Sequence, residues 1–180
     1  MVLEHQTEMH NFITLASYET RMSLHHDATM NPILERPKGF VSESTQRRIS
    51  RVAEKLVRHM LFADEIPLTD KITGTSKFTQ QFVGLGVKDK QGRSLRDFDL
   101  SRRIFKYPCS YLIYSDSFRA LPSKVKSQVY QRIWNVLTEK NQAKEFAALS
   151  SKDRQAILAI LRDTNSDLPA YWKQPRAVQR

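Results

Sequence analysis

Residues 42–64 read SESTQRRISRVAEKLVRHMLFAD, and this stretch decides the fold class of the chain. Its apolar residues recur at intervals of three and four, which is the spacing of one face of an α-helix. They are Ile49, Val52, Ala53, Leu56, Val57, Met60 and Leu61. Ser42 or Ser44 can cap the start, because a serine hydroxyl accepts a hydrogen bond from a backbone N–H of the first turn. The pattern predicts a helix over residues 43–64.

The region before this stretch predicts a helix followed by a loop. Between residues 2 and 26 the apolar side chains fall roughly on one side of a helix. They are Leu3, Met9, Phe12, Ile13, Ala16 and Leu24. Pro32, Pro37 and Gly39 then break the spacing, so residues 27–41 are expected to form a loop.

Between residues 66 and 106 prolines and glycines interrupt the helical spacing. Only residues 76–83 indicate a short helix, and the remainder is expected to be a long ordered loop. Residues 107–117, YPCSYLIYSDS, favour a helix, because Pro108 suits the first helical position.

Three further elements are predicted in the last third of the chain. Pro122 opens a helix that ends near Lys140, and a short helical turn follows at residues 146–149. Ser150 with Asp153 is a variant of the capping box, so a last helix is expected over 151–163. The tail after it is expected to dock by Leu168, Tyr171 and Trp172.

The elements together predict an all-α fold, an irregular bundle of five or six helices with a long ordered loop. The chain of 180 residues fits a single helical domain over 1–172, with a frayed tail over 173–180. Its expected core is Val52, Leu56, Val57, Met60, Leu61, Val129, Ile133, Leu137, Ile157, Ile160 and Leu161. No run of about 18 apolar residues predicts a transmembrane segment.

The chain is strongly basic, with 29 lysines and arginines against 19 acidic residues and a pI near 9.9. Residues 1–35 carry a net charge of −4 and residues 36–60 a net charge of +5. The excess positive charge predicts attraction to an anionic partner. For contact with an acidic protein or domain the candidate residues are Arg47, Arg51, Lys55, Arg58, Arg102 and Arg103.

Nucleic acid is a second candidate partner. The predicted basic helix and a further cluster could together track phosphates; the cluster is Arg93, Arg96, Arg102, Arg103 and Lys106. Specific readout lacks a recognised platform, because no helix-turn-helix turn, aromatic RNA-binding motif or zinc finger is present.

The sequence lacks the common signatures of enzymes and metalloproteins. Cys109 is the only cysteine, so an intrachain disulfide, a zinc–thiolate cluster and a CxxCH haem attachment are excluded within these 180 residues. The GxGxxG, GxxxxGK[ST], HExxH and GxSxG motifs are absent as well. A non-enzymatic role is therefore favoured. Cys109 lies in an apolar run, where burial is expected to raise the pKa of its thiol.

Histidines near the start offer a third possibility. His5, Glu8 and His10 are candidate metal ligands, although the His-x-x-Glu order occurs only once, whereas a di-iron bundle needs Glu-x-x-His twice. We therefore assign no metal. A haem could take His5, His10 or His59 as an axial ligand, but no cofactor is expected to be fixed by these residues alone.

Three blocks of sequence carry a resemblance: VLEHQTEMHN from residue 2, LVRHMLFADE from residue 56 and RSLRDFDLSRRIFKYPCSYLIYS from residue 93. They resemble the C-terminal region of uncharacterised bacterial envelope proteins that carry a cytochrome-c-like portion elsewhere. The resemblance implies an accessory piece of a longer periplasmic or envelope protein, with haem only in an upstream segment. A true start at Met1 would favour the cytoplasm.

The leading hypothesis is a non-enzymatic helical interaction domain of an envelope protein linked to cytochrome-type redox modules, with a basic surface that contacts an acidic partner. A cytoplasmic nucleic-acid-binding protein and a haem- or metal-binding redox protein are the alternatives.

Overall fold

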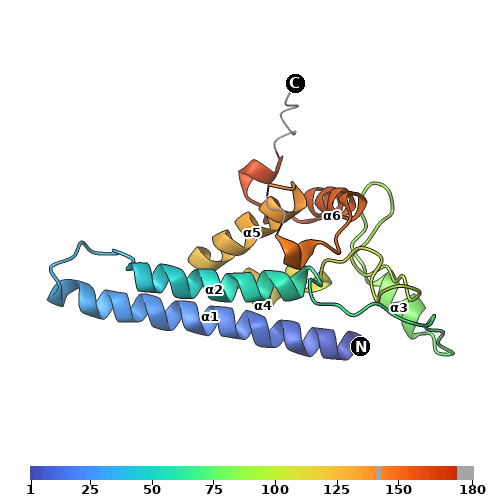
Figure 1. Ribbon diagram of the computed structural model, residues 1–180, viewed down its shortest axis with the longest axis horizontal. Helices are drawn as coiled ribbons and strands as arrows, with labels where there is room; N and C mark the ends of the chain where they lie inside the picture. The colour runs from blue at the N-terminus through green and yellow to red at the C-terminus, as the bar shows by residue number, and fades with distance from the viewer. Residues whose placement is uncertain (141–142, 174–180) are drawn as a thin grey trace, which may run out of the picture. The chain divides into compact units, whose positions relative to one another are not determined.

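The computed structural model describes residues 1–140 and 143–173, and that part of the chain contains six α-helices and no β-strand. The prediction of an all-α fold is thus confirmed (Figure 1). The helices are α1 (Val2–Ile33), α2 (Glu43–Met60), α3 (Phe78–Gly84), α4 (Asp116–Arg119), α5 (Ser123–Leu137) and α6 (Ser151–Thr164). Three short 3₁₀ turns are η1 (Tyr111–Tyr114), η2 (Lys144–Phe146) and η3 (Ala170–Lys173).

The chain forms two compact units. Unit 1 consists of residues 1–61 and 112–133, and unit 2 consists of residues 62–111 and the chain from Trp134 onward. Each unit thus combines two separate stretches of sequence, and α5 contributes its residues up to Ile133 to unit 1 and the remainder to unit 2. The expectation of a single domain over 1–172 stays a prediction.

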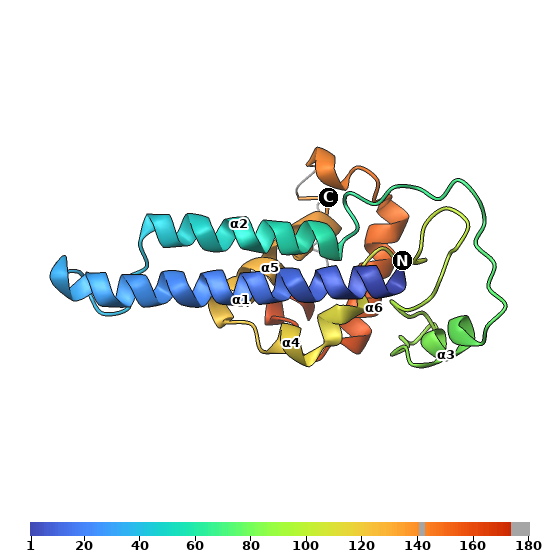
Figure 2. The same cartoon turned by 90° about the horizontal axis from the view of Figure 1, so that it is seen from below.

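The helices α1 and α2 lie side by side in unit 1 as an antiparallel pair (Figures 1 and 2). The expected end of α1 near residue 26 is wrong, since the helix continues through Pro32 to Ile33. Pro32 has no N–H to donate, so it removes one backbone hydrogen bond, and the helix ends one residue later. The Asn31 amide also donates to the carbonyl of Phe40 at 2.8 Å, which holds this last turn against the loop.

The buried face of α1 agrees with the predicted apolar side in the first half of the helix, where Met9, Ile13 and Ala16 are buried, and differs from it at Leu3 and in the second half. Leu3 is 75% exposed, whereas the second half of the helix buries four polar residues at intervals of three and four: Thr20, Ser23, Asp27 and Asn31. Asp27 accepts a hydrogen bond from the Ser42 N–H at 2.8 Å. Burial works to raise the pKa of Asp27, but hydrogen bonds from Ser42 and Thr45 outweigh it and hold the pKa below its usual value. Polar pairing therefore replaces apolar packing at this end of the hairpin.

Helix α2 begins where the sequence predicts, with the Ser42 hydroxyl accepting from the Thr45 N–H at 3.2 Å. It ends at Met60, four residues before the predicted end. The positive φ of 53° at Phe62 explains this, because a left-handed backbone conformation stops an α-helix. All residues of the predicted core are buried.

Unit 2 contains α3 within the long loop that the sequence predicts. The loop is ordered by a cluster of stacked rings in which Phe82, Phe98 and Phe105 lie with centroids 5.0 to 6.1 Å apart. The guanidinium of Arg96 lies 4.7 Å from the Phe82 ring centroid and 4.4 Å from that of Tyr111. Arg96 thus packs between aromatic rings, which is a different role from the phosphate contact considered above.

The expected helix over 107–117 is wrong. Pro108 lies outside any helix, η1 begins only at Tyr111, and Ser115 caps the single turn of α4 by accepting from the Phe118 N–H at 3.2 Å. The short helical turn expected at 146–149 is a 3₁₀ turn that begins two residues earlier, at Lys144. Short apolar runs lack the length that separates one helical type from another.

Helix α6 confirms its predicted start. The Ser150 side chain accepts from the Asp153 N–H at 3.1 Å, and the Asp153 carboxylate accepts from the Ser150 N–H in return. The tail docks as predicted by Leu168 and Trp172, which are buried, while Tyr171 is half-buried. Of the predicted frayed tail, residues 174–180 lie outside the described residues. No helix among the described residues is long and apolar enough to cross a membrane.

Candidate functional site

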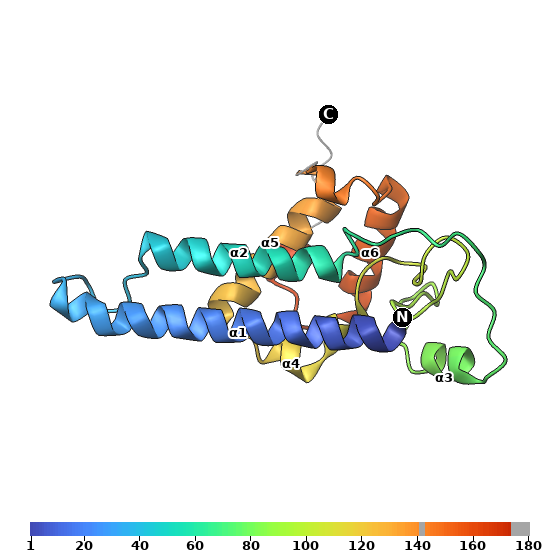
Figure 3. The ribbon, with the colours of Figure 1, turned by 60° about the horizontal axis from the view of Figure 1, so that its bottom comes forward.

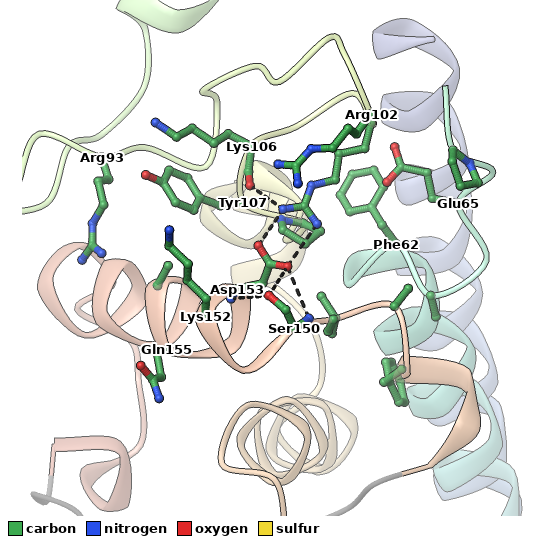
Figure 4. Close-up of a pocket in the computed structure, with 18 of the residues that line it drawn as sticks. Phe62, Glu65, Arg93, Arg102, Lys106, Tyr107, Ser150, Lys152, Asp153 and Gln155 are labelled. Carbon is green, nitrogen blue, oxygen red and sulfur yellow. Dashed lines mark hydrogen bonds and ion pairs between the residues drawn. The ribbon is translucent and has the colours of Figure 1, made fainter. Parts of the chain in front are cut away.

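A cavity of about 880 Å³ opens in unit 2 between the loop after α2, the long loop and the start of α6 (Figure 4). Its charged lining consists of five cations and three acids: Arg93, Arg102, Arg103, Lys106, Lys152, Glu65, Glu145 and Asp153. The side chains of Phe62, Pro108 and Leu149 supply apolar surface beside them. The cavity is therefore amphipathic and carries more positive than negative charge.

The three arginines of the cavity are each held by an aspartate. Arg93 contacts the buried carboxylate of Asp89 at 2.6 Å, and Arg102 contacts Asp99 at 3.0 Å. Arg103 donates to both carboxylate oxygens of Asp153, at 2.6 and 3.2 Å. These pairs fix the long loop, because planar guanidinium groups that are paired through two bonds lose their rotational freedom.

Lys106 and Lys152 differ from the arginines. Among residues 1–140 and 143–173, no carboxylate lies within ion-pair distance of either ammonium group. Both side chains are exposed, and the Lys106 ammonium lies 5.6 Å from the centroid of the Tyr107 ring. Figure 4 shows Lys152 pointing from α6 toward the loop that carries Tyr107. These two lysines leave the cavity with positive charge that its own acids do not neutralise.

The carboxylates of the cavity are occupied by structural roles. Burial raises the pKa of Glu65 above its usual value. The Ile104 N–H donates a hydrogen bond to this carboxylate at 3.1 Å, which works to lower the pKa but is outweighed by burial. Burial also works to raise the pKa of Asp153, but the hydrogen bonds from Arg103 and Ser150 outweigh it and lower the pKa. Asp153 thus joins the arginine of the loop to the cap of α6, and it stays ionised at neutral pH.

The residues that the sequence proposed for partner contact belong to two groups. Arg47, Arg51 and Lys55 are exposed in one row along α2 in unit 1, where Arg47 also pairs with Glu43 at 2.6 Å. Arg58 continues the row and is half-buried. Arg102 and Arg103 line the cavity of unit 2.

Sequence reasoning named Lys106 within a basic cluster but missed Lys152. The signal that could have found Lys152 is its position between Ser150 and Asp153 of the capping box. This position places it in the first turn of a helix, next to the loop that precedes the helix. Its proximity to the long loop depends on tertiary structure. Charge patterning alone therefore could not assign it to the cavity.

The histidine and glutamate candidates lie in unit 1. His5 stacks on His59 with ring centroids 5.1 Å apart, and the Glu8 carboxylate lies 3.6 Å from Nε2 of His59. His10 lies elsewhere, with Nδ1 3.4 Å from the hydroxyl of Ser117. Among the described residues, no group of three or more histidine, cysteine, aspartate or glutamate side chains could hold a metal ion.

Cys109 is completely buried in unit 2, and burial raises the pKa of its thiol to about 12. The sequence prediction of a buried thiol with a raised pKa is confirmed. A thiol with this pKa is not a nucleophile at neutral pH, because the thiolate is the reactive form.

Comparisons of the chain with protein-family models, with curated proteins and with solved structures found no match.

Proposed function

We propose that this protein is a non-enzymatic interaction domain that binds an acidic segment of a partner protein in the cavity of unit 2. The observation that carries the proposal is the pair of lysines, Lys106 and Lys152, whose charges have no acidic partner among the described residues. The three arginines beside them are already paired, so they shape the cavity and the lysines attract the ligand.

The lining also indicates what kind of acidic segment fits. Phe62, which is half-buried, and Pro67, which is exposed, offer apolar contact in the same cavity as the two ammonium groups. A segment that alternates acidic and apolar residues would satisfy both kinds of surface, because rim charges steer a partner while apolar contact supplies affinity. The three arginine–aspartate pairs keep the loop in place before the partner arrives, which reduces the entropy lost on binding.

The row of cations on α2 supports a second contact with an acidic partner. Arg51 and Lys55 are exposed one helical turn apart, and Arg47 lies one further turn toward the N-terminus. The wider hypothesis, a domain of an envelope protein linked to cytochrome-type modules, rests on the resemblance of the three sequence blocks and stays a prediction. Nucleic-acid binding and haem or metal binding also stay predictions.

Reversing the two cavity charges tests the proposal. In the Lys106→Glu/Lys152→Glu variant, affinity for a fluorescein-labelled peptide of alternating glutamate and leucine is expected to fall at least about tenfold, since two attractive pairs become repulsive. Fluorescence anisotropy at low ionic strength measures this. The matched control is Lys71→Glu/Lys88→Glu, which makes the same change in net charge at two exposed lysines outside the cavity.

Equal peptide affinity in the cavity variant and the control would contradict the proposal. A labelled single-stranded oligonucleotide measured in parallel tests the nucleic-acid alternative. Binding of the oligonucleotide but not of the peptide, with a steep loss of affinity as salt increases, would favour that alternative instead.

A further inference from the structure

The connection between α1 and α2 presents an unusual surface, which we call the hairpin tip and define as residues 30–42. Three large apolar side chains of this short segment are exposed: Ile33 by 69%, Leu34 by 48% and Phe40 by 42%. Arg36 and Lys38 lie among them in sequence, and both are exposed. Figures 2 and 3 show the tip lying beyond α4 and the start of α5, the other helices of unit 1.

The exposure of these apolar side chains is fixed by hydrogen bonds within the tip. The Asn31 side chain and the Asp27 carboxylate hold the loop at Phe40 and Ser42, as described above. The Arg36 N–H donates to the Asn31 carbonyl at 2.8 Å, and the Phe40 N–H donates to the Pro37 carbonyl at 3.0 Å. The tip is thus a folded turn that holds its apolar side chains outward.

Arginine side chains also lie next to apolar side chains at this end of the hairpin. The Arg36 guanidinium lies 5.1 Å from the centroid of the Phe40 ring. A shallow cavity of about 610 Å³ adjoins the tip and combines the apolar side chains of Met22, Met30 and Leu34 with the guanidinium groups of Arg36, Arg47 and Arg48.

Two acids and a buried hydroxyl also line this cavity, together with His26, Ser42, Ser44 and Thr45. Glu43 pairs with Arg47 at 2.6 Å, and Asp27 is occupied by Ser42, so neither acid neutralises Arg48. The hydroxyl of Ser23 is buried and has no hydrogen-bond partner among the described residues. The lining suits a molecule that has an anionic head and an apolar chain.

From these observations we infer that the hairpin tip inserts into the surface of an anionic lipid bilayer. Exposed apolar residues with cations beside them match the interface between acyl chains and negatively charged headgroups. The hairpin tip lies wholly in unit 1, so this inference is independent of the cavity proposed above to bind an acidic segment.

Co-sedimentation of the whole protein with vesicles tests the inference. We expect binding to vesicles of phosphatidylcholine mixed with phosphatidylglycerol and at most weak binding to phosphatidylcholine alone. Each cation near an anionic surface contributes about fivefold to partitioning. The Arg36→Glu/Lys38→Glu variant should therefore partition at least about tenfold less, and Ile33→Ser/Leu34→Ser/Phe40→Ser should lose binding to a similar extent.

Two controls match these variants. Lys71→Glu/Lys88→Glu changes the net charge equally outside the tip, and Leu3→Ser removes an apolar residue that is more exposed than any of the three, at the other end of α1. Both should bind vesicles like the wild type. Circular dichroism establishes that every variant keeps its helices. As a second readout, the emission of a Phe40→Trp variant should shift to shorter wavelength when anionic vesicles are added.

Wild-type protein that stays in solution with anionic vesicles at low ionic strength would overturn the inference, as would tip variants that sediment like the wild type. Displacement from vesicles by millimolar inorganic phosphate would indicate a site for free phosphate and would overturn it too. The variant Lys106→Glu/Lys152→Glu distinguishes the two proposals, because it should lose the acidic peptide and keep the vesicles.

Discussion

Replacement of Arg154 with methionine is expected to lower the free energy of unfolding by about 3 kcal/mol. This side chain lies buried in α6 and donates hydrogen bonds to three backbone carbonyls. Its Nε donates to Leu149 at 3.0 Å and one terminal nitrogen donates to Phe146 at 2.7 Å, while the other donates to Val136. Methionine fills similar space but leaves these carbonyls without the donor.

The charge of Arg154 is also placed favourably. Val136 lies in the last turn of α5, where backbone carbonyls concentrate partial negative charge. Among the described residues no carboxylate pairs with Arg154, so the carbonyls alone compensate its burial. One side chain thus joins α6, the end of α5 and the turn between them, and its loss should loosen all three.

Urea unfolding followed by circular dichroism measures the effect. Gln155→Met is the matched control, because Gln155 is the exposed neighbour on the same helix and its replacement should change stability by less than about 0.5 kcal/mol. Arg154→Lys should fall between the two, since an ammonium group cannot reach three carbonyls in a fixed fork. Arg154→Met with wild-type stability would show that the carbonyls find other donors.

Acidification is expected to destabilise the protein through His5. Burial, and to a smaller extent the charge of the neighbouring His59, lower the pKa of this imidazole from 6.5 to about 4. The unfolded chain therefore binds a proton more readily than the folded one. Stability from this group is complete above pH 6.5 and is lost as the pH falls toward 4. Since each tenfold difference in proton affinity is worth about 1.4 kcal/mol, the loss reaches about 3 kcal/mol.

The groups that face His5 explain why protonation is unfavourable. The ring stacks on His59, which itself packs 5.0 Å from the Phe12 ring and 3.6 Å from the Glu8 carboxylate. Glu8 is exposed, lies three residues after His5 in the sequence, and contacts His59. A proton on His5 would place two imidazoles of like charge between α1 and α2 once His59 is protonated as well.

Urea unfolding of wild type and His5→Phe between pH 7 and pH 4.5 tests this prediction. Phenylalanine keeps the stacked ring and cannot be protonated, so the difference in stability between the two proteins should change by about 2 kcal/mol across that range. His25→Gln, an exposed substitution on the same helix, should follow the wild type. Parallel pH profiles for wild type and His5→Phe would show that His5 does not cause the acid sensitivity.

Local patterns predicted those elements whose start and buried face are encoded by neighbouring residues. Helix α2 has both a serine cap and apolar residues at intervals of three and four, and α6 has a reciprocal cap between Ser150 and Asp153. Their starts and core residues were therefore predictable. The last turns of α1 were not, because their buried residues Thr20, Ser23, Asp27 and Asn31 are polar. The burial of Asp27 and Asn31 depends on partners across the hairpin, and the hydroxyls of Thr20 and Ser23 are buried with no hydrogen-bond partner among the described residues.

In the candidate site, too, some features were predictable from the sequence and others depend on tertiary structure. The sequence by itself determined the all-helical fold, the excess of positive charge and the basic character of Arg102, Arg103 and Lys106. Only the tertiary structure placed Lys152 at the same cavity and paired Arg103 with Asp153. The physical reason is range: capping and helical periodicity act over a few residues of the chain, whereas a charge is neutralised by whichever group the fold brings within a few ångströms.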